Sequence, residues 1–177
     1  TQRNLEVFKT TANTRVGSLL DVMDQTSSAA GSRLLERFLG APEKDLDEIL
    51  RRQSAVKDFS SRPSLVSKIE EIFRSGSDIE RILGRLQNRM ARPREVGGVR
   101  TMLRGLPALR EILLEVGTES ASIQALAEGV NTFDPLRELL EQSLEEELPA
   151  EIKVDVKGQS GSVIRNGYDE DFDQLRE

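Results

Sequence analysis

The side chains that could carry chemistry in this chain are mostly carboxylates and arginines. Its 177 residues include no cysteine, histidine or tryptophan. Thiol nucleophiles, histidine general bases, Cys/His zinc sites and di-iron sites built on Glu-x-x-His are therefore excluded. Acidic residues, serines, lysines and the single tyrosine, Tyr168, remain. Any catalysis by this chain would have to be built from these groups.

Two acidic clusters are the candidates for a reactive or metal-binding site. The first consists of Glu138, Glu141, Glu145, Glu146 and Glu147. Acid–base catalysis needs a cleft and perturbed pKa values, so a solvated helix face is the favoured interpretation. The second consists of Asp169, Glu170, Asp171 and Asp173. Its spacing does not match the EF-hand calcium loop. An acidic cluster at a helix N-terminus is therefore the favoured interpretation. The sequence predicts no catalytic, cofactor-binding or metal-binding residue.

The sequence also lacks clear motifs for binding a nucleotide or a nucleic acid. No lysine follows a glycine, so the P-loop pattern that cradles phosphates is missing. The net charge of −6 argues against a main DNA-binding surface. Arg81, Arg85 and Arg89 form a basic row that could follow phosphates, but pairing with acids of neighbouring helices is favoured. The turn from Gly158 to Gly161 has the spacing of a KH-domain loop but joins strand patterns instead of helices.

One helix, over residues 77–90, is predicted to form the centre of the fold. Its apolar residues recur at the three- and four-residue steps that line one side of a helix. Ser77 and Glu80 form a potential capping box at its start. If Leu83 lies in the core, Leu83→Ala should cost on the order of 2–5 kcal/mol. The predicted structural core consists of Leu35, Phe38, Ile69, Ile79, Ile82, Leu83 and Leu86.

The remaining patterns predict an all-α fold, a multi-helix bundle, with a small β-hairpin near the C-terminus. Gly97 and Gly98 should weaken one helix, and Pro107 should open the next. The last helix of the bundle is expected to run from Leu136 to Leu148. Together these elements form one predicted domain over residues 1–177. Its parts are an extended lead-in over 1–14, a helical bundle over 15–149, a hairpin over 150–166 and the start of a further helix over 168–177.

Several stretches of this sequence, taken in order, resemble the core, or lever, domain of the DNA mismatch repair family MutS. The matching stretches are residues 2–6, 17–20, 31–35, 78–85, 92–95 and 161–169, and they extend across almost the whole chain. Short pieces of this kind are common singly, but their shared order is specific. The residues that carry the resemblance are Arg33, Asp78, Arg81, Arg85, Pro93, Gly167 and Tyr168.

The resemblance implies a structural and allosteric segment that links a connector domain and a DNA clamp to an ATPase domain. ATP, magnesium, mismatched duplex DNA and a homodimer would then belong to the parent protein, in the cytoplasm, and this segment would need no cofactor and catalyse nothing. The last residues would begin a truncated lever helix. The alternative is a self-contained helical interaction module without any link to DNA repair. A repeat array would show a constant period, and this chain shows none.

Overall fold

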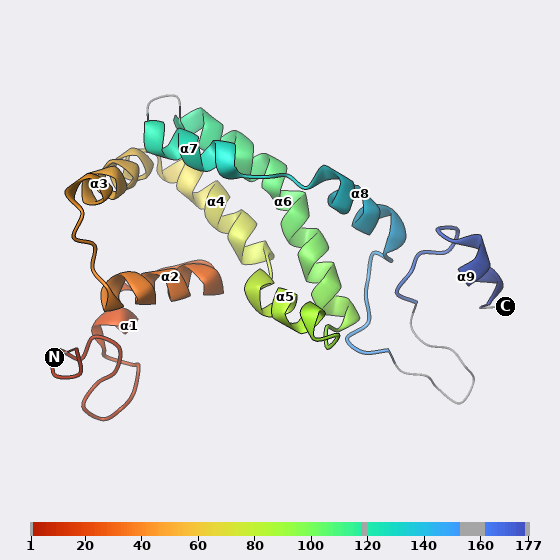
Figure 1. Cartoon of the computed structure of the whole chain (residues 1–177), viewed down its shortest axis with the longest axis horizontal. Helices are drawn as coiled ribbons and strands as arrows, with labels where there is room; N and C mark the ends of the chain where they lie inside the picture. The colour runs from red at the N-terminus through yellow and green to blue at the C-terminus, as the bar shows by residue number, and fades with distance from the viewer. Residues whose placement is uncertain (1, 118–119, 153–161, 176–177) are drawn as a thin grey trace. The chain divides into compact units, whose positions relative to one another are not determined.

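The structure, a computed structural model, describes residues 2–117, 120–152 and 162–175. These residues form α-helices joined by turns, and no strand occurs among them (Figure 1). The prediction of an all-α fold is confirmed. In chain order the helices are α1 (Leu19–Met23), α2 (Ala29–Gly40), α3 (Leu46–Ser60), α4 (Pro63–Ser75), α5 (Ile79–Gln87), α6 (Pro93–Gly117), α7 (Ala121–Gly129), α8 (Asp134–Ser143) and α9 (Glu170–Gln174).

Contacts between residues divide the chain into two compact units. The first comprises residues 1–74 and 112–127, and the second comprises residues 75–111 and 128–177. Helices α1 to α3, and α4 except its last residue, lie in the first unit, and α5, α8 and α9 lie in the second. Helices α6 and α7 contribute residues to both units. The single domain predicted over residues 1–177 stays a prediction.

The N-terminal segment of the first unit folds back onto α1. The backbone N–H of Leu19 donates to the carbonyl of Glu6 at 3.0 Å, and that of Leu20 donates to Val7 at 2.9 Å. Val7 and Leu20 are both buried. The segment is built from turns, and Glu6 adopts a positive φ of 50°. The predicted extended lead-in is therefore wrong, because turns are needed to bring Val7 over α1.

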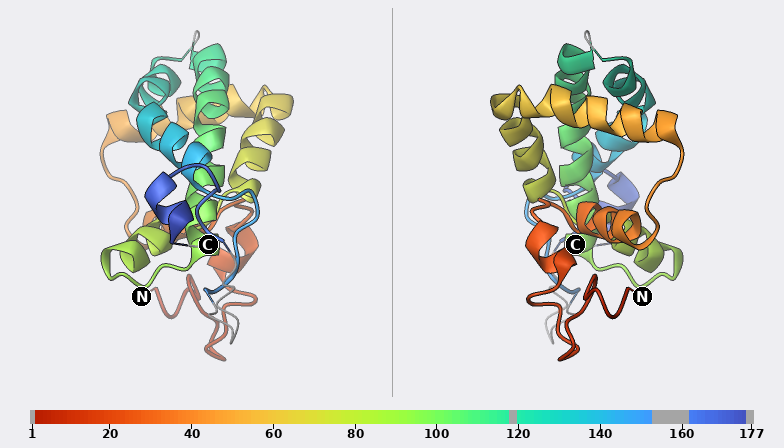
Figure 2. Two further views of the ribbon diagram at one scale, coloured as in Figure 1. Left: turned by 90° about the vertical axis from the view of Figure 1, so that its right-hand side faces the viewer. Right: turned by 90° about the vertical axis from the view of Figure 1, so that its left-hand side faces the viewer.

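Helix α6 carries more buried side chains than any other described helix. They are Arg100, Leu103, Leu109, Leu113 and Val116. Pro107 lies inside this helix instead of opening a new one, and the ribbon is continuous in both views of Figure 2. An internal proline removes one helical hydrogen bond and costs roughly 3 kcal/mol or more. Burial of Leu103 and Leu109 on either side offsets that cost, so the predicted break at Pro107 is wrong.

Helix α8 ends at Ser143, earlier than predicted. Leu144 leaves the helix with an extended backbone, at φ −97° and ψ 142°, and makes an isolated antiparallel bridge with Ile164. The predicted hairpin over 150–166 is not supported, because Ile164 pairs with Leu144 and the described residues of that range form no strand. Residues 153–161, which hold most of the predicted hairpin, lie outside the described residues.

Helix α5 begins two residues later than predicted. Asp78 is its N-cap, and the Asp78 carboxylate accepts a hydrogen bond from the backbone N–H of Arg81 at 3.3 Å. The predicted capping box of Ser77 and Glu80 is wrong. Aspartate caps a helix as well as serine does, and the Ser77 side chain lies instead against Gly98 of α6.

The apolar stripe of α5 is only partly buried. Ile82 is 3% exposed, whereas Leu83 is 49% and Leu86 39% exposed. Phe38 of α2 is 40% exposed, so the core prediction was wrong for Leu83, Leu86 and Phe38. Ile82 is the residue of the stripe that lies against Gly98 of α6 in the described contacts, which is consistent with its deep burial. The other predicted core residues are half-buried, namely Leu35, Ile69 and Ile79.

Candidate functional site

The start of α6 is fixed by Glu95. Its carboxylate oxygen Oε2 accepts hydrogen bonds from the backbone N–H of Arg92 at 2.8 Å and from Arg85 Nε at 2.9 Å. Pro93 occupies the first helical position, where its missing N–H costs nothing. These bonds, that from the Arg92 backbone first, lower the pKa of Glu95. Glu95 therefore joins the Arg85 side chain of α5 to the N-terminus of α6.

Two consecutive glycines let other segments approach α6 closely. A Cβ atom on Gly98 would lie 2.8 Å from Ser77 Cβ and 3.5 Å from Ile82 Cδ1. A Cβ atom on Gly97 would lie 2.8 Å from Leu148 Cδ1. Atoms this close would have to move apart, so the glycines have a packing role. The helix continues through them, because close packing offsets their low helix propensity.

Arg100 is buried one turn further along α6. Its side chain is 4% exposed, and its guanidinium group donates hydrogen bonds to three consecutive carbonyls. Nη1 lies 3.3 Å from the oxygen of Leu144 and 2.8 Å from that of Glu145, and Nη2 lies 2.7 Å from that of Glu146. We call Arg100 and the three carbonyls that it bonds, those of residues 144–146, the carbonyl clasp. It satisfies carbonyls just beyond the end of α8, and a cation is favoured there.

Arg104 extends the contact between α6 and α8 toward the surface. Its guanidinium group pairs with both carboxylate oxygens of Glu141, and Nη1 lies 3.3 Å from Glu146 Oε1. These two acids raise the pKa of Arg104 above its usual range. In turn, the hydrogen bonds from Arg104 lower the pKa of Glu141 and of Glu146. The pairs are partly solvated, so their contribution is modest beside that of the buried clasp.

The segment 143–148, which includes the carbonyls bonded by Arg100, also forms hydrogen bonds with residues 163–165. The backbone N–H of Glu145 donates to the carbonyl of Val163 at 3.0 Å, and that of Arg165 donates to Ser143 at 2.8 Å. Leu144 is 4% exposed. The segment 143–148 is thus bonded to α6 through side chains and to 163–165 through the backbone. This arrangement is suited to holding parts of the second unit in a fixed relation.

Comparison with known proteins places this chain in a family. The family model described as MutS domain III matches residues 1–175. The chain belongs to the MutS domain III family. It is 34% identical over 176 residues to the DNA mismatch repair protein MutS of Christiangramia forsetii (strain DSM 17595 / CGMCC 1.15422 / KT0803), a match covering 99% of this chain. The chain spans 19% of the length of that relative.

Most of the residues that carry the resemblance to MutS have local structural roles. Asp78 caps α5, Arg85 bonds Glu95, and Pro93 opens α6. Gly167 has a φ of +81°, which a side chain would strain, and its N–H donates to Asp173 Oδ2 at 2.7 Å. The others lie closer to solvent: Arg33 is half-buried, and Arg81 and Tyr168 are exposed.

In the first unit, a polar cluster around Asp24 includes Ser32 of the MutS-like stretch 31–35. The Asp24 carboxylate accepts hydrogen bonds from the hydroxyls of Thr26, at 2.6 Å, and Ser32, and it pairs with Arg15. These bonds, led by that from Ser32, hold the pKa of Asp24 far below its usual range. The cluster joins the end of α1 to the first turn of α2.

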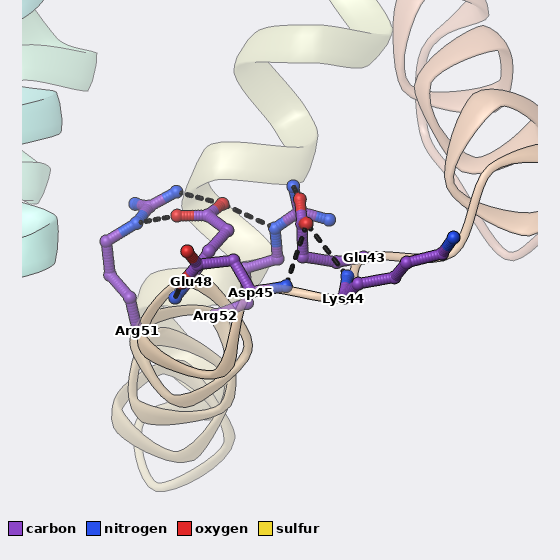
Figure 3. A network of polar contacts seen from close by, with 6 residues as sticks. All are labelled: Glu43, Lys44, Asp45, Glu48, Arg51 and Arg52. Atoms are coloured by element: carbon purple, nitrogen blue, oxygen red, sulfur yellow. Dashed lines mark hydrogen bonds and ion pairs between the residues drawn. The ribbon is translucent and has the colours of Figure 1, made fainter.

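A second network in the first unit surrounds the start of α3 (Figure 3). Glu48 accepts hydrogen bonds from Arg51 and Arg52, both at 2.6 Å, and these lower its pKa to about 2. Figure 3 shows Glu43 on the other side of Arg52, and Arg52 Nη2 lies 3.4 Å from Glu43 Oε2. The Arg52 guanidinium also lies 4.1 Å from the centre of the Phe38 ring. The network ties the loop before α3 to its first two turns.

Arg100 is the main residue that sequence reasoning missed. It stands four residues after Val96 and three before Leu103, inside the apolar repeat of α6. A charged residue at a core position, close to a Gly97–Gly98 pair, was the available signal. Reading the glycines as helix-weakening hid the close approach that they permit.

Among the residues that the structure describes, no three acidic side chains are grouped in a way that could hold a metal ion. Asp169 caps α9, because its carboxylate accepts a hydrogen bond from the backbone N–H of Phe172 at 3.0 Å.

Within the same described ranges, no helix combines the length and apolar character needed to cross a membrane.

Proposed function

We propose that this chain is a structural and transmission segment of a DNA mismatch repair protein, with no catalysis of its own. Its membership of the MutS domain III family and its likeness to a protein named for mismatch repair support this role. Binding of ATP, magnesium and mismatched duplex DNA, homodimer formation and a cytoplasmic location would be properties of the parent. The segment would link its connector domain and DNA clamp to its ATPase domain.

The observation that carries the proposal is the carbonyl clasp. Transmission of a displacement requires parts that move together, and Arg100 bonds three consecutive carbonyls of residues 144–146 at once. Moving that segment relative to α6 would break all three bonds together and leave a buried guanidinium group unpaired. Loss of a single hydrogen bond to a charged group costs roughly 1.5–3 kcal/mol. The clasp therefore holds residues 144–146 and the part of α6 around Arg100 together as one stiff body within the second unit.

The test replaces Arg100 in the full-length parent protein. Arg100→Lys keeps the charge but loses the planar fork that reaches several carbonyls. Arg110→Lys is the matched control, because Arg110 is an exposed residue of the same helix. We expect Arg100→Lys to keep basal ATPase activity and mismatch affinity within about twofold while slowing ATP-driven release from DNA by roughly tenfold, equivalent to about 1.4 kcal/mol.

Two results would contradict the proposal. One is an unchanged ATP-driven release rate in Arg100→Lys, with the clasp shown to be lost. The other is hydrolysis of ATP by the 177-residue chain alone. A thermal melt by circular dichroism verifies that both variants are folded before release is compared. The alternative of a self-contained module is not favoured, because the family match covers residues 1–175 without interruption.

A further inference from the structure

The N-terminal ends of α5 and α6 frame a pocket of about 410 Å³ within the second unit. No residue of this pocket takes part in the carbonyl clasp. Three arginines from two segments converge on it: Arg81 from α5, and Arg92 and Arg94 from the start of α6. The remaining lining residues are Ser77, Asp78, Ile82, Glu95 and Ala150.

The three arginines are exposed, and the ion pairs described for two of them are weak. The Arg81 side chain is 73% exposed and its nitrogen lies 4.0 Å from Glu95, at the limit of an ion pair. Arg92 lies 3.4 Å from Glu151, and both side chains are more than half exposed. Arg94 is exposed as well. Solvated pairs of this kind are weak and exchange readily for a better anion.

The two carboxylates of the lining are already engaged by other groups. Asp78 caps α5 through the N–H of Arg81, and Glu95 accepts from Arg85 Nε and the Arg92 backbone. Arg85 offsets the charge of Glu95, so the exposed guanidinium groups keep a positive potential at the mouth. The N-terminal dipoles of α5 and α6 add to it in the same sense.

We propose that this pocket binds a phosphate group, from a nucleotide or from a nucleic-acid backbone. A phosphate presents more acceptor oxygens than a carboxylate and takes charge-assisted bonds from several guanidinium groups at once. The incoming phosphate replaces Glu151 as the partner of Arg92 and draws in Arg81 and Arg94. The proposal does not depend on the transmission role of the clasp.

The experiment follows backbone amide shifts of residues 78–82 and 92–96 by NMR during titration of the 177-residue chain. The probes are inorganic pyrophosphate, a 20-base-pair duplex, and hexaglutamate as a carboxylate control. Arg94→Gln should weaken binding of the phosphate probes by about five- to tenfold, the effect of one lost charge-assisted bond. Glu151→Gln should tighten it by about two- to fivefold, because a competing anion is removed. Arg74→Gln, at an exposed arginine of the other unit, should leave it unchanged.

The probes distinguish the two sources of phosphate. Binding of pyrophosphate alone points to a nucleotide, binding of the duplex alone points to a nucleic-acid backbone, and binding of both supports the shared chemistry. Three results overturn the proposal: no binding of either phosphate probe at about 10 mM, equal affinity for hexaglutamate, or an affinity that Arg94→Gln leaves unchanged. A purely structural role for the arginines would not make Glu151→Gln bind more tightly.

Discussion

Replacing Gly98 by alanine tests the close packing of α6 most directly. In an ordinary helix interior, alanine is more stable than glycine by about 0.5–1 kcal/mol. Here the new Cβ would lie 2.8 Å from Ser77 Cβ, an atom that cannot rotate away. Forcing a methyl group into a packed contact costs about 1–3 kcal/mol. The clash outweighs the propensity gain, so Gly98→Ala should destabilise the chain by about 0.5–2 kcal/mol.

The assay is urea unfolding followed by circular dichroism, with two further variants as controls. Gly84→Ala lies in α5 with no atom within 4 Å of the new Cβ. It should stabilise by about 0.5–1 kcal/mol. Ser77→Gly removes the opposing Cβ, so Gly98→Ala should lose most of its cost in that background, giving a coupling energy of about 1 kcal/mol. If Gly98→Ala stabilises as Gly84→Ala does, or if Ser77→Gly rescues nothing, the packing argument fails.

Three further predictions concern burial, surface pairing and pH. Ile82→Ala should cost about 2–4 kcal/mol and Leu83→Ala under about 1 kcal/mol in urea melts, and the reverse order would refute the burial assigned to α5. A double-mutant cycle on Arg104 and Glu141 should give a coupling of at most about 1 kcal/mol, and a far larger value would show a pair shielded from water. Because the pKa of Glu48 is lowered from 4.5 to about 2, its stabilising effect is complete above about pH 4.5 and is lost as the pH falls toward 2. Stability measured from pH 5 to pH 2.5 should fall less steeply in Glu48→Gln than in the parent chain, and equal slopes would exclude this linkage.

The helical class could be predicted from local pattern. Apolar spacing, proline at first helical positions and capping residues depend on neighbours in sequence, which is why the all-α fold was expected. Pro107 shows where this reasoning stops. Its local preference is to open a helix, but burial of residues on both sides keeps α6 continuous. Only the tertiary packing decides between these outcomes.

The candidate site was less predictable, since its contacts join residues far apart in the chain. Arg85 was expected to pair with an acid of a neighbouring helix, and its partner Glu95 supports that interpretation. Nothing local indicated that Arg100 would meet carbonyls some 44–46 residues away. The apolar period on α5 predicted one buried stripe, but it could not tell which edge of the stripe would face α6. Leu83 was placed in the core for that reason.

Hydrogen–deuterium exchange of residues 143–148 in the full-length parent tests the central claim most directly. If the carbonyl clasp transmits the nucleotide state, exchange in this segment should change when ATP is added to the DNA-bound protein. The change should be lost in Arg100→Lys and kept in Arg110→Lys. Exchange that is the same with and without ATP, or a response that survives Arg100→Lys, would contradict the account.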